Sequence, residues 1–157
     1  MAGIFLFLKY FIQMKNILIL FTLTISSIAC AQNWETNWED ASAKAKQYNQ
    51  NIILVFSGSD WCAPCIKLDR EIWQSVEFQT FANNHWVLLR ADFPRKKENK
   101  LSEAQIAENT RLAEKYNEYG YFPLVVLLNA DGIVLGKTGY KNISVKEYIE
   151  ELKTLEN

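Results

Sequence analysis

Three apolar runs along the chain predict the buried strands of a single sheet. The first gives a strand at 52–57, where Ile-Ile-Leu-Val-Phe forms an unbroken, β-branched-rich run between polar neighbours. Asp131-Gly132 readily supplies the positive φ angles of a hairpin turn, so the strand before it and the strand after it are expected to pair. The other core strands are expected at 85–92 and 122–129, with edge strands at 34–37 and 133–137.

Apolar residues at helical spacing separate these strands. They recur at the intervals of one helix face from Trp38 to Tyr48, and Ser75, Ser102 and Ser144 stand where they can cap later helices. This alternation predicts a mixed α/β sheet covered by helices on both faces, without an internal repeat or a second domain. Helices are expected at 38–48, 62–73, 76–82, 102–117 and 144–155.

The first 31 residues follow a different pattern, that of a secretory signal. Lys15 precedes an apolar stretch at 17–25, and small residues follow it up to Ala31. A spanning helix needs about 20 apolar residues, so an uncleaved anchor is the least favoured interpretation. Two endings stay open, because Ala29-Cys30-Ala31 is an A-x-A cleavage site and Cys30 is a candidate lipidated first residue. Ser27 stands where a lipobox usually has leucine, which favours the soluble form.

The charge balance and the cysteine count narrow the partners and the compartment. The 157 residues carry a formal net charge of −1 and no long basic run, so a nucleic-acid partner is not expected. Removing 1–31 also removes Lys9 and Lys15, which leaves a net charge of −3 and two cysteines. We therefore expect 32–157 to form one exported, periplasmic domain, in a compartment where disulfides persist.

The two remaining cysteines, Cys62 and Cys65, carry the candidate chemistry. They fall where the strand at 52–57 ends and a helix begins. Free N–H groups and the positive end of the helix dipole favour a thiolate at such a place. Thiolates at helix starts in Cys-X-X-Cys motifs have pKa values lowered to about 3.5–7.5. This is the environment that a redox nucleophile needs.

Two other interpretations of the pair are a zinc half-site and a structural disulfide. Zinc requires about four ligands, and besides the pair the mature chain offers only His85 and scattered acids. A structural disulfide would close a very short loop, which constrains the unfolded chain little. A redox couple is therefore favoured, with no metal and no cofactor expected, and His85 is interpreted as a surface or strand-edge residue.

The segment Trp61-Cys62-Ala63-Pro64-Cys65 resembles the Trp-Cys-Gly-Pro-Cys motif of the thioredoxin superfamily, and Phe122-Pro123 stands where that family carries its cis-proline. More narrowly, 38–71 is similar to exported thioredoxin-like proteins, among them the C-terminal domain of the membrane electron carrier that feeds the periplasm. Residues 92–94 and the insertion after them resemble a subgroup common in Bacteroidetes-type bacteria. The resemblance covers about 34–155 and implies a thioredoxin fold, with a central mixed sheet of four to five strands flanked by helices on both faces.

The resemblance implies an exported thiol-disulfide oxidoreductase that reduces protein disulfides. Cys62, the more exposed sulfur, would attack a substrate disulfide, and Cys65 would resolve the mixed disulfide. The implied partners are disulfide-containing proteins and a membrane-bound or exported thiol electron donor, and we expect a monomer. The alternative hypothesis is a thioredoxin-fold binding or chaperone-like module whose disulfide is structural or serves as a sensor.

Five further residues are expected to shape the site. Trp61 would form one wall, and Ala63 and Pro64 occupy the motif between the cysteines, where Pro64 resembles the reducing members and fits the first turn of a helix. Pro123 in the cis form would remove a backbone N–H near the sulfurs and present the backbone of Phe122 to an extended substrate. The cis form is implied by the resemblance alone, since only about 5–6% of X-Pro bonds in folded proteins are cis.

Two positions depart from the family pattern. Phe56 stands where thioredoxins bury an acid that helps to deprotonate the second cysteine, and Leu88 replaces a lysine. Proton transfer at Cys65 would then use water or another group. Asp60, Asp69 and Glu71 are the candidates, although exposed acids without such a role are the simpler interpretation.

The polar insertion at 94–100 and the tryptophans have simple interpretations. The insertion is expected to be a solvated loop, with the sharper hypothesis that it borders the cysteines and selects a partner. The tryptophans outside the motif are expected to pack in the core or at its edge; they are Trp34, Trp38, Trp73 and Trp86.

Overall fold

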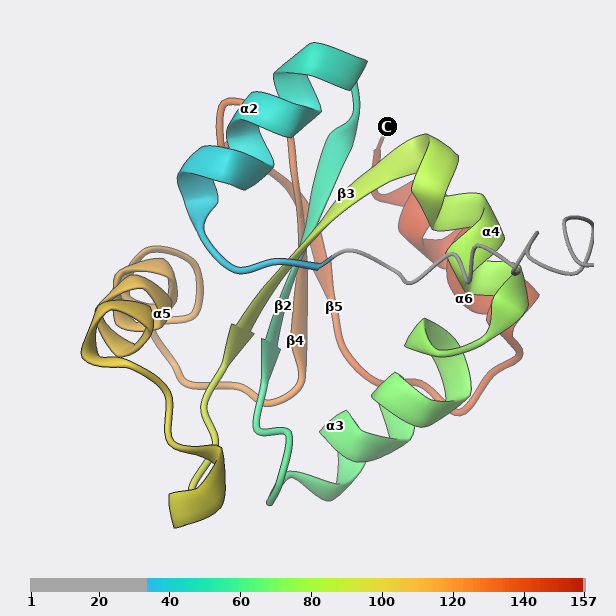
Figure 1. Ribbon diagram of the computed structural model, residues 1–157. Coiled ribbons are helices and arrows are strands. Elements are labelled where there is room, and N and C mark those ends of the chain that lie inside the picture. The colour runs from blue at the N-terminus through green and yellow to red at the C-terminus, as the bar shows by residue number, and fades with distance from the viewer. Residues whose placement is uncertain (1–33, 157) are drawn as a thin grey trace, which may run out of the picture. The chain divides into compact units, whose positions relative to one another are not determined.

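The computed structural model describes residues 34–156, within which the apolar runs form the centre of a five-stranded mixed sheet, in the order β1-β3-β2-β4-β5 (Figure 1). The expected leader at 1–31, with Cys30, lies outside the described residues. β2 (Asn51–Ser57) is central, parallel to β3 (Trp86–Asp92) and antiparallel to β4 (Leu124–Leu128). The edge strands are β1 (Trp34–Glu35), parallel to β3, and β5 (Val134–Thr138), antiparallel to β4.

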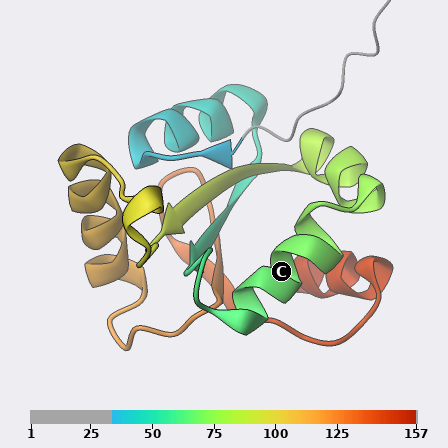
Figure 2. The same ribbon diagram turned by 60° about the horizontal axis from the view of Figure 1, so that its bottom comes forward.

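Helices cover both faces of this sheet, which confirms the expected α/β architecture (Figures 1 and 2). One face carries α2 (Trp38–Tyr48) and α5 (Glu103–Tyr116), and the other carries α3 (Ala63–Leu68), α4 (Val76–His85) and α6 (Val145–Thr154). A π-helical turn (Asp69–Trp73) continues α3, and a 3-10 turn (Lys97–Asn99) precedes α5. In the described part of the chain, no helix has the length and apolar character needed to cross a membrane.

Successive residues of β2 point to opposite faces of the sheet and therefore enter two separate cores. The α3-side core contains Ile53 and Val55 of β2 and four large rings, those of Trp73, Phe78, Trp86 and Tyr148. The α5-side core contains Ile52, Leu54 and Phe56 of β2, with Ala41, Ala45 and Leu112 from the helices. Trp34 packs at the edge of the first core and Trp38 at the edge of the second, so the tryptophans pack as expected.

The boundary between α4 and β3 differs from the prediction. α4 runs to His85, beyond the expected end at 82, and β3 starts only at Trp86. The His85 ring stacks on Phe81 with 3.7 Å between centroids, and its Nδ1 lies 2.7 Å from the Phe81 carbonyl oxygen. Residues four apart face each other on a helix and not on a strand, so this contact accompanies the longer helix. The prediction that His85 opens the strand is wrong.

Two further elements differ from the predicted pattern. The second half of the expected helix at 62–73 winds as the π-helical turn, in which the Gln74 N–H reaches back five residues to the Asp69 carbonyl oxygen at 2.9 Å. β4 begins at Leu124 and not at residue 122, and the backbone N–H and carbonyl of Tyr121, just before the expected start, bond to the Asn117 side chain.

Candidate active site

The redox turn, 58–65, leaves the end of β2 and runs into the first turn of α3. The N–H groups of Trp61 and Cys62 donate to the Gly58 carbonyl oxygen at 3.3 and 2.9 Å, which turns the chain out of the sheet. Cys62 is the N-cap of α3, followed by Ala63 and Pro64 in the first helical turn. Proline is well tolerated there because the first N–H groups of a helix have no partner within it.

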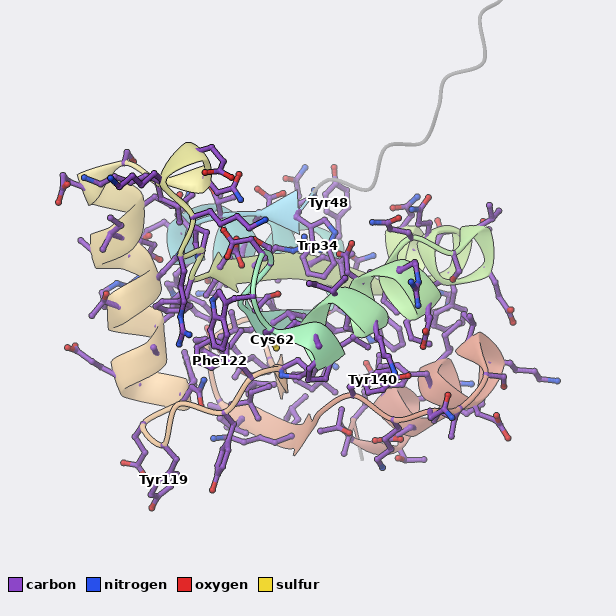
Figure 3. The ribbon with its side chains drawn as sticks, turned by 90° about the horizontal axis from the view of Figure 1, so that it is seen from below. Trp34, Tyr48, Cys62, Tyr119, Phe122 and Tyr140 are labelled. Carbon is purple, nitrogen blue, oxygen red and sulfur yellow. A yellow bond between two sulfur atoms is a disulfide. The ribbon has the colours of Figure 1, made fainter. Side chains whose placement is uncertain are left out.

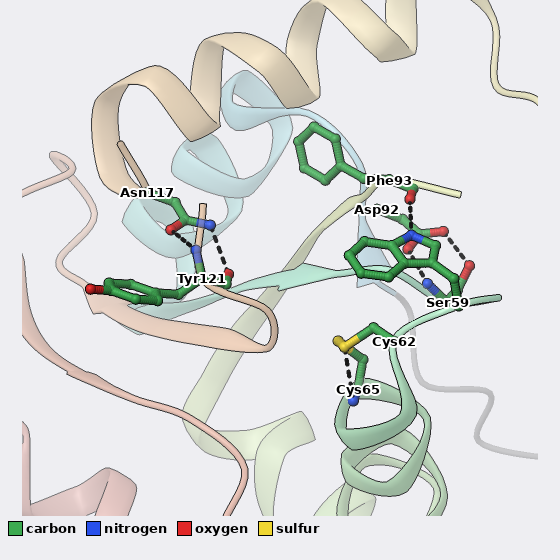
Figure 4. The surroundings of a disulfide bond; sticks show 8 residues. Ser59, Cys62, Cys65, Asp92, Phe93, Asn117 and Tyr121 are labelled. Carbon is green, nitrogen blue, oxygen red and sulfur yellow. Dashed lines mark hydrogen bonds between the residues drawn. A yellow bond between two sulfur atoms is a disulfide. The ribbon is translucent and has the colours of Figure 1, made fainter. Parts of the chain in front are cut away.

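Cys62 and Cys65 form a disulfide, with an S–S distance of 2.04 Å and Cα atoms 5.2 Å apart (Figure 4). The Cys65 N–H, which has no partner within the helix, donates to Cys62 Sγ at 3.3 Å, so the start of α3 directs a hydrogen-bond donor at this sulfur. A helix start directs partial positive charge at such a group, and it stabilises negative charge there. Cys62 is 5% exposed and Cys65 is 3% exposed, so Cys62 is the more exposed of the two, as expected, but only by a small margin.

Trp61 is held on several sides and forms a wall beside the disulfide. Its indole N–H donates to the Phe93 carbonyl oxygen at 2.7 Å, and its ring meets Phe122 edge to face with 5.5 Å between centroids. The Arg95 guanidinium lies 3.6 Å from the centroid of the indole, a cation–π contact. Only glycine fits at position 58, since a Cβ there would lie 2.4 Å from the indole.

The Phe122–Pro123 peptide bond is cis, as the resemblance implied, and lies at the same edge of the sheet as Cys62 (Figure 3). The loop before it is fixed by the buried side chain of Asn117. That amide donates to the Tyr121 carbonyl oxygen and accepts from the Tyr121 N–H, both at 2.9 Å (Figure 4). One amide therefore holds both backbone groups of the residue that precedes Phe122.

Asp92, the last residue of β3, connects the redox turn to α5. Its carboxylate accepts from the Ser59 N–H at 2.9 Å and from the Ser59 hydroxyl at 2.5 Å. Its backbone carbonyl accepts from the Asn109 side chain of α5 at 2.6 Å. A single residue thus joins the start of the motif to the helix that follows the insertion.

Asp60 holds the insertion at 94–100 against the redox turn. Its carboxylate accepts from the N–H groups of Arg95 and Lys96, both at 3.0 Å, and from the Asn99 amide at 2.9 Å. These donors, the Arg95 N–H first, lower the pKa of Asp60 below its ordinary value. The insertion therefore borders the motif directly, which the simpler interpretation of a solvated loop did not anticipate.

The other acids considered for proton transfer also bond to groups outside the disulfide. Asp69 pairs with Arg90 at 2.8 Å. Glu71 accepts from the Tyr140 hydroxyl at 2.8 Å, and this bond is the main reason why the pKa of Glu71 is lowered. Phe56 is fully buried in the α5-side core and Leu88 is 4% exposed in the α3-side core, so apolar packing occupies both positions at which the family carries charge.

The structure thus brings together the seven predicted site residues, and it adds residues that the sequence did not single out. These are Asp92, Phe93, Arg95 and Asn117. The first three contact residues of the redox turn that lie more than thirty positions earlier in the chain. Asn117 contacts the loop that directly follows it. An acid at the end of a strand and an asparagine just after a helix were the available signals. Across residues 34–156, no group of three His, Cys, Asp or Glu side chains is placed to hold a metal ion.

Comparison with known proteins gives a consistent result. A family model described as thioredoxin-like matches residues 33–130. The disulfide bond reductase DsbH of Chlamydia pneumoniae is 36% identical over 121 residues, which cover 77% of this chain and 70% of that protein. A solved structure of a DsbH oxidoreductase superposes with a TM-score of 0.74 at 34% identity, covering 85% of this chain and 90% of that one. A thioredoxin from Thermus thermophilus, at 15% identity and a TM-score of 0.58 over 80% of this chain and 87% of its own, shares the fold.

Proposed function

Because the chain belongs to the thioredoxin-like family and is a thiol-disulfide oxidoreductase, we propose that it acts as a reductant of disulfides in exported proteins. Cys62 is the attacking thiol and Cys65 the resolving thiol in this proposal. The observation that carries it is the N–H of Cys65 directed at Cys62 Sγ, at the start of α3 and beside Trp61. The similarity to a protein named as a disulfide bond reductase supports the reducing direction.

The reaction begins from the reduced pair and proceeds in two exchanges. The Cys62 thiolate attacks one sulfur of the substrate disulfide, a mixed disulfide forms, and the other substrate sulfur leaves and takes up a proton. The Cys65 thiolate then attacks Cys62 Sγ, which closes the Cys62–Cys65 disulfide and releases the second substrate thiol. The substrate gains two electrons and two protons, and a thiol donor restores the reduced pair.

The residues around the sulfurs form the surface on which the substrate is held during these steps. Trp61 and Phe122 meet edge to face and form one wall, against which a substrate chain can lie. Ala63 and Pro64 start the helix whose N–H groups face Cys62. The backbone on either side of the Phe122–Pro123 bond is the surface along which we place the substrate peptide.

We also infer that the working domain is 32–157 and that it acts in the periplasm. The signal-like pattern of 1–31 supports export, and Ser27 supports cleavage before Gln32 over lipidation at Cys30. The donor is then a membrane-bound or exported thiol protein, and we expect the domain to act as a monomer.

Turnover of an insulin-type disulfide substrate tests the proposal. In the presence of a thiol donor, the wild type is expected to accelerate reduction over the donor alone, and Cys62→Ser to lose this activity by roughly a thousand-fold or more. Cys65→Ala keeps the attacking sulfur and should accumulate the mixed disulfide. Unchanged circular dichroism of both variants excludes misfolding as the cause.

The reduction potential of the pair tests the direction. A value near that of thioredoxin, about −270 mV, supports a reductant, whereas a value near about −120 mV supports an oxidant. A wild type without turnover, whose pair stays oxidised at strongly reducing potentials, would contradict the enzyme and favour a binding module with a structural disulfide.

A further inference from the structure

A cavity of about 310 Å³ lies beside the redox turn, between the insertion and α5. This volume falls at the lower end of ligand pockets, about 300–1,000 Å³. Its apolar lining consists of Phe93, Pro94, Leu101 and Ile106, and four cationic residues line it as well, namely Arg95, Lys96, Lys97 and Lys100. We call it the basic pocket. Figure 2 shows the two segments that carry most of this lining, the yellow turn of the insertion and the start of α5, side by side.

Two residues belong both to the basic pocket and to the wall of the active site. Arg95 lines the pocket and places its guanidinium 3.6 Å from the centroid of the Trp61 ring. Phe93 lines the pocket, accepts the indole N–H of Trp61, and meets Phe122 with 5.5 Å between ring centroids. The pocket therefore adjoins the wall of the active site through Arg95 and Phe93.

The charge around the pocket is positive, opposite in sign to the net charge of −1 of the whole chain. Lys96 and Lys97 form no salt bridge with any other residue among 34–156, and Lys100 pairs only loosely with Glu103 at 3.5 Å. Asp92 is the one acid among the lining residues, against four cations, and it accepts from Ser59. Asp60, Glu98 and Glu103 carry negative charge close by but do not line the pocket. Such a surface attracts carboxylates and raises the rate of encounter with an acidic partner.

We propose that the basic pocket is a substrate subsite, which takes an apolar side chain flanked by acidic residues from the protein whose disulfide is reduced. This inference rests on the proposed function and names the class of substrate. A peptide is the occupant because the pocket adjoins the wall at which the substrate is held through Cys62. Once the mixed disulfide has formed, the neighbouring segment is at high effective concentration, so even a weak subsite selects between substrates.

The test uses three disulfide peptides that differ only a few residues from the cysteine. One carries a leucine between glutamates, the second replaces that leucine by serine, and the third replaces the glutamates by lysines. The rate constant for reduction by the wild type is expected to be about tenfold higher for the first peptide than for the third, in the range of electrostatic steering. The serine peptide should fall between them. High salt should reduce the charge preference, since about 1 M salt shortens the Debye length to about 3 Å.

The pair of substitutions Lys96→Glu and Lys97→Glu is expected to reverse the preference between the acidic and the basic peptide. The Lys96 main-chain N–H that bonds to Asp60 is kept, because only side chains change. The matched control is Lys146→Glu with Lys46→Glu, which makes the same change of charge in α6 and α2, outside the pocket and the redox turn. The readout for each variant is the ratio of the rate constants for the acidic and the basic peptide. A change that affects both rate constants equally does not alter this ratio.

A ratio near one for the wild type, or a ratio that changes equally in the pocket and control variants, would overturn the subsite. A version of the acidic peptide with serine for cysteine separates this failure from failure of the proposed function, because its binding to the oxidised protein needs no redox step. Titration calorimetry should show binding to the wild type that the pocket variant loses and the control variant keeps. Absence of binding together with a ratio near one rejects the subsite, and binding without turnover rejects only the reductase.

Discussion

The two faces of the sheet are packed by side chains of different size. On the α3 side, the Trp73 ring meets those of Phe78, Tyr148 and Trp34 at centroid distances of 4.7, 5.6 and 5.9 Å, all edge to face. On the α5 side, α2 approaches the sheet through Ala41 and Ala45, both fully buried. One face is built around the large ring of Trp73, and on the other α2 packs through two alanines beside the rings of Phe56 and Tyr116.

This difference matches what each face supports. Trp73 ends the π-helical turn that continues α3, so the α3-side core holds the helix of Cys62 and Cys65 from its far end. The α5-side core supports α5, which borders the basic pocket and bonds through Asn109 to the end of β3. The face organised around Trp73 positions the sulfurs, and the face on which α2 packs through alanines positions the proposed recognition surface.

Removing the central ring should produce the largest effect. Trp73→Ala leaves a cavity where three aromatic contacts were made, and it is expected to lower the free energy of unfolding by about 3–5 kcal/mol. Urea denaturation of the oxidised protein, followed by circular dichroism, measures this value. Tyr119→Ala is the control, because Tyr119 is 76% exposed and should change stability by less than about 0.5 kcal/mol. A loss of under about 1 kcal/mol for Trp73→Ala would show that no single ring organises this core.

A larger side chain in the α5-side core should destabilise the protein less than Trp73→Ala does. Ala45→Leu places a larger side chain between α2 and the sheet, at a position with no exposed surface, and overpacking typically costs about 1–3 kcal/mol. Gln47→Leu introduces the same side chain at an exposed position of the same helix and should be nearly neutral. Equal unfolding midpoints for the two variants would mean that α2 is not closely packed.

The smallest expected effect concerns the hydrogen bonds through which Asp60 joins the redox turn to the insertion. Asp60 belongs to the redox turn, yet its partners lie in the insertion, and the Arg95 N–H and the other donors lower its pKa below the ordinary value of an aspartate. A carboxyl whose pKa is depressed by folding contributes stability above its unfolded pKa and loses it as pH falls through the folded pKa. The wild type should therefore lose more stability than Asp60→Asn between about pH 5 and the lowered pKa.

Unfolding curves across this range, with Glu118→Gln as an exposed control, measure the difference. Parallel pH profiles for the wild type and Asp60→Asn would show that the carboxylate does not hold the insertion. In that case the insertion would be held by Arg95 on Trp61 and by the bonds of Phe93 and Asp92 at its start.

Elements defined by local sequence were predicted well. The helix at Trp38–Tyr48 has the expected bounds, and Ser75, Ser102 and Ser144 all cap helices through their hydroxyls. Capping and apolar periodicity depend on residues within a few positions of one another, so a single sequence contains the necessary information. The motif at 61–65 was likewise recognisable from its spacing, and its place at a strand-to-helix boundary followed from the apolar run before it.

Features without a capping or periodic signal in the chain were not predicted. The π-helical turn and the longer α4 could not be told from ordinary helical patterns, and the role of Asp60 depends on residues 35 to 39 positions away. Asn117 was interpreted only as the end of a helix, although its side chain fixes the loop before Pro123. Neither the hydrogen bonds of a loop nor the choice between α- and π-helical winding leaves a periodic signal in the chain.

The near-complete burial of both cysteines bears on how long the reduced protein would survive among oxidants. A thiolate is oxidised to sulfenic and then irreversibly to sulfinic acid in proportion to its exposure and reactivity. In the disulfide form Cys62 is only 5% exposed, so a freely diffusing oxidant meets little of its surface. A peptide bound against the wall of the site, by contrast, keeps its disulfide beside that sulfur, and the exchange gains from this proximity. The thiol is then more reactive toward a bound disulfide than toward oxidants that it meets only by collision.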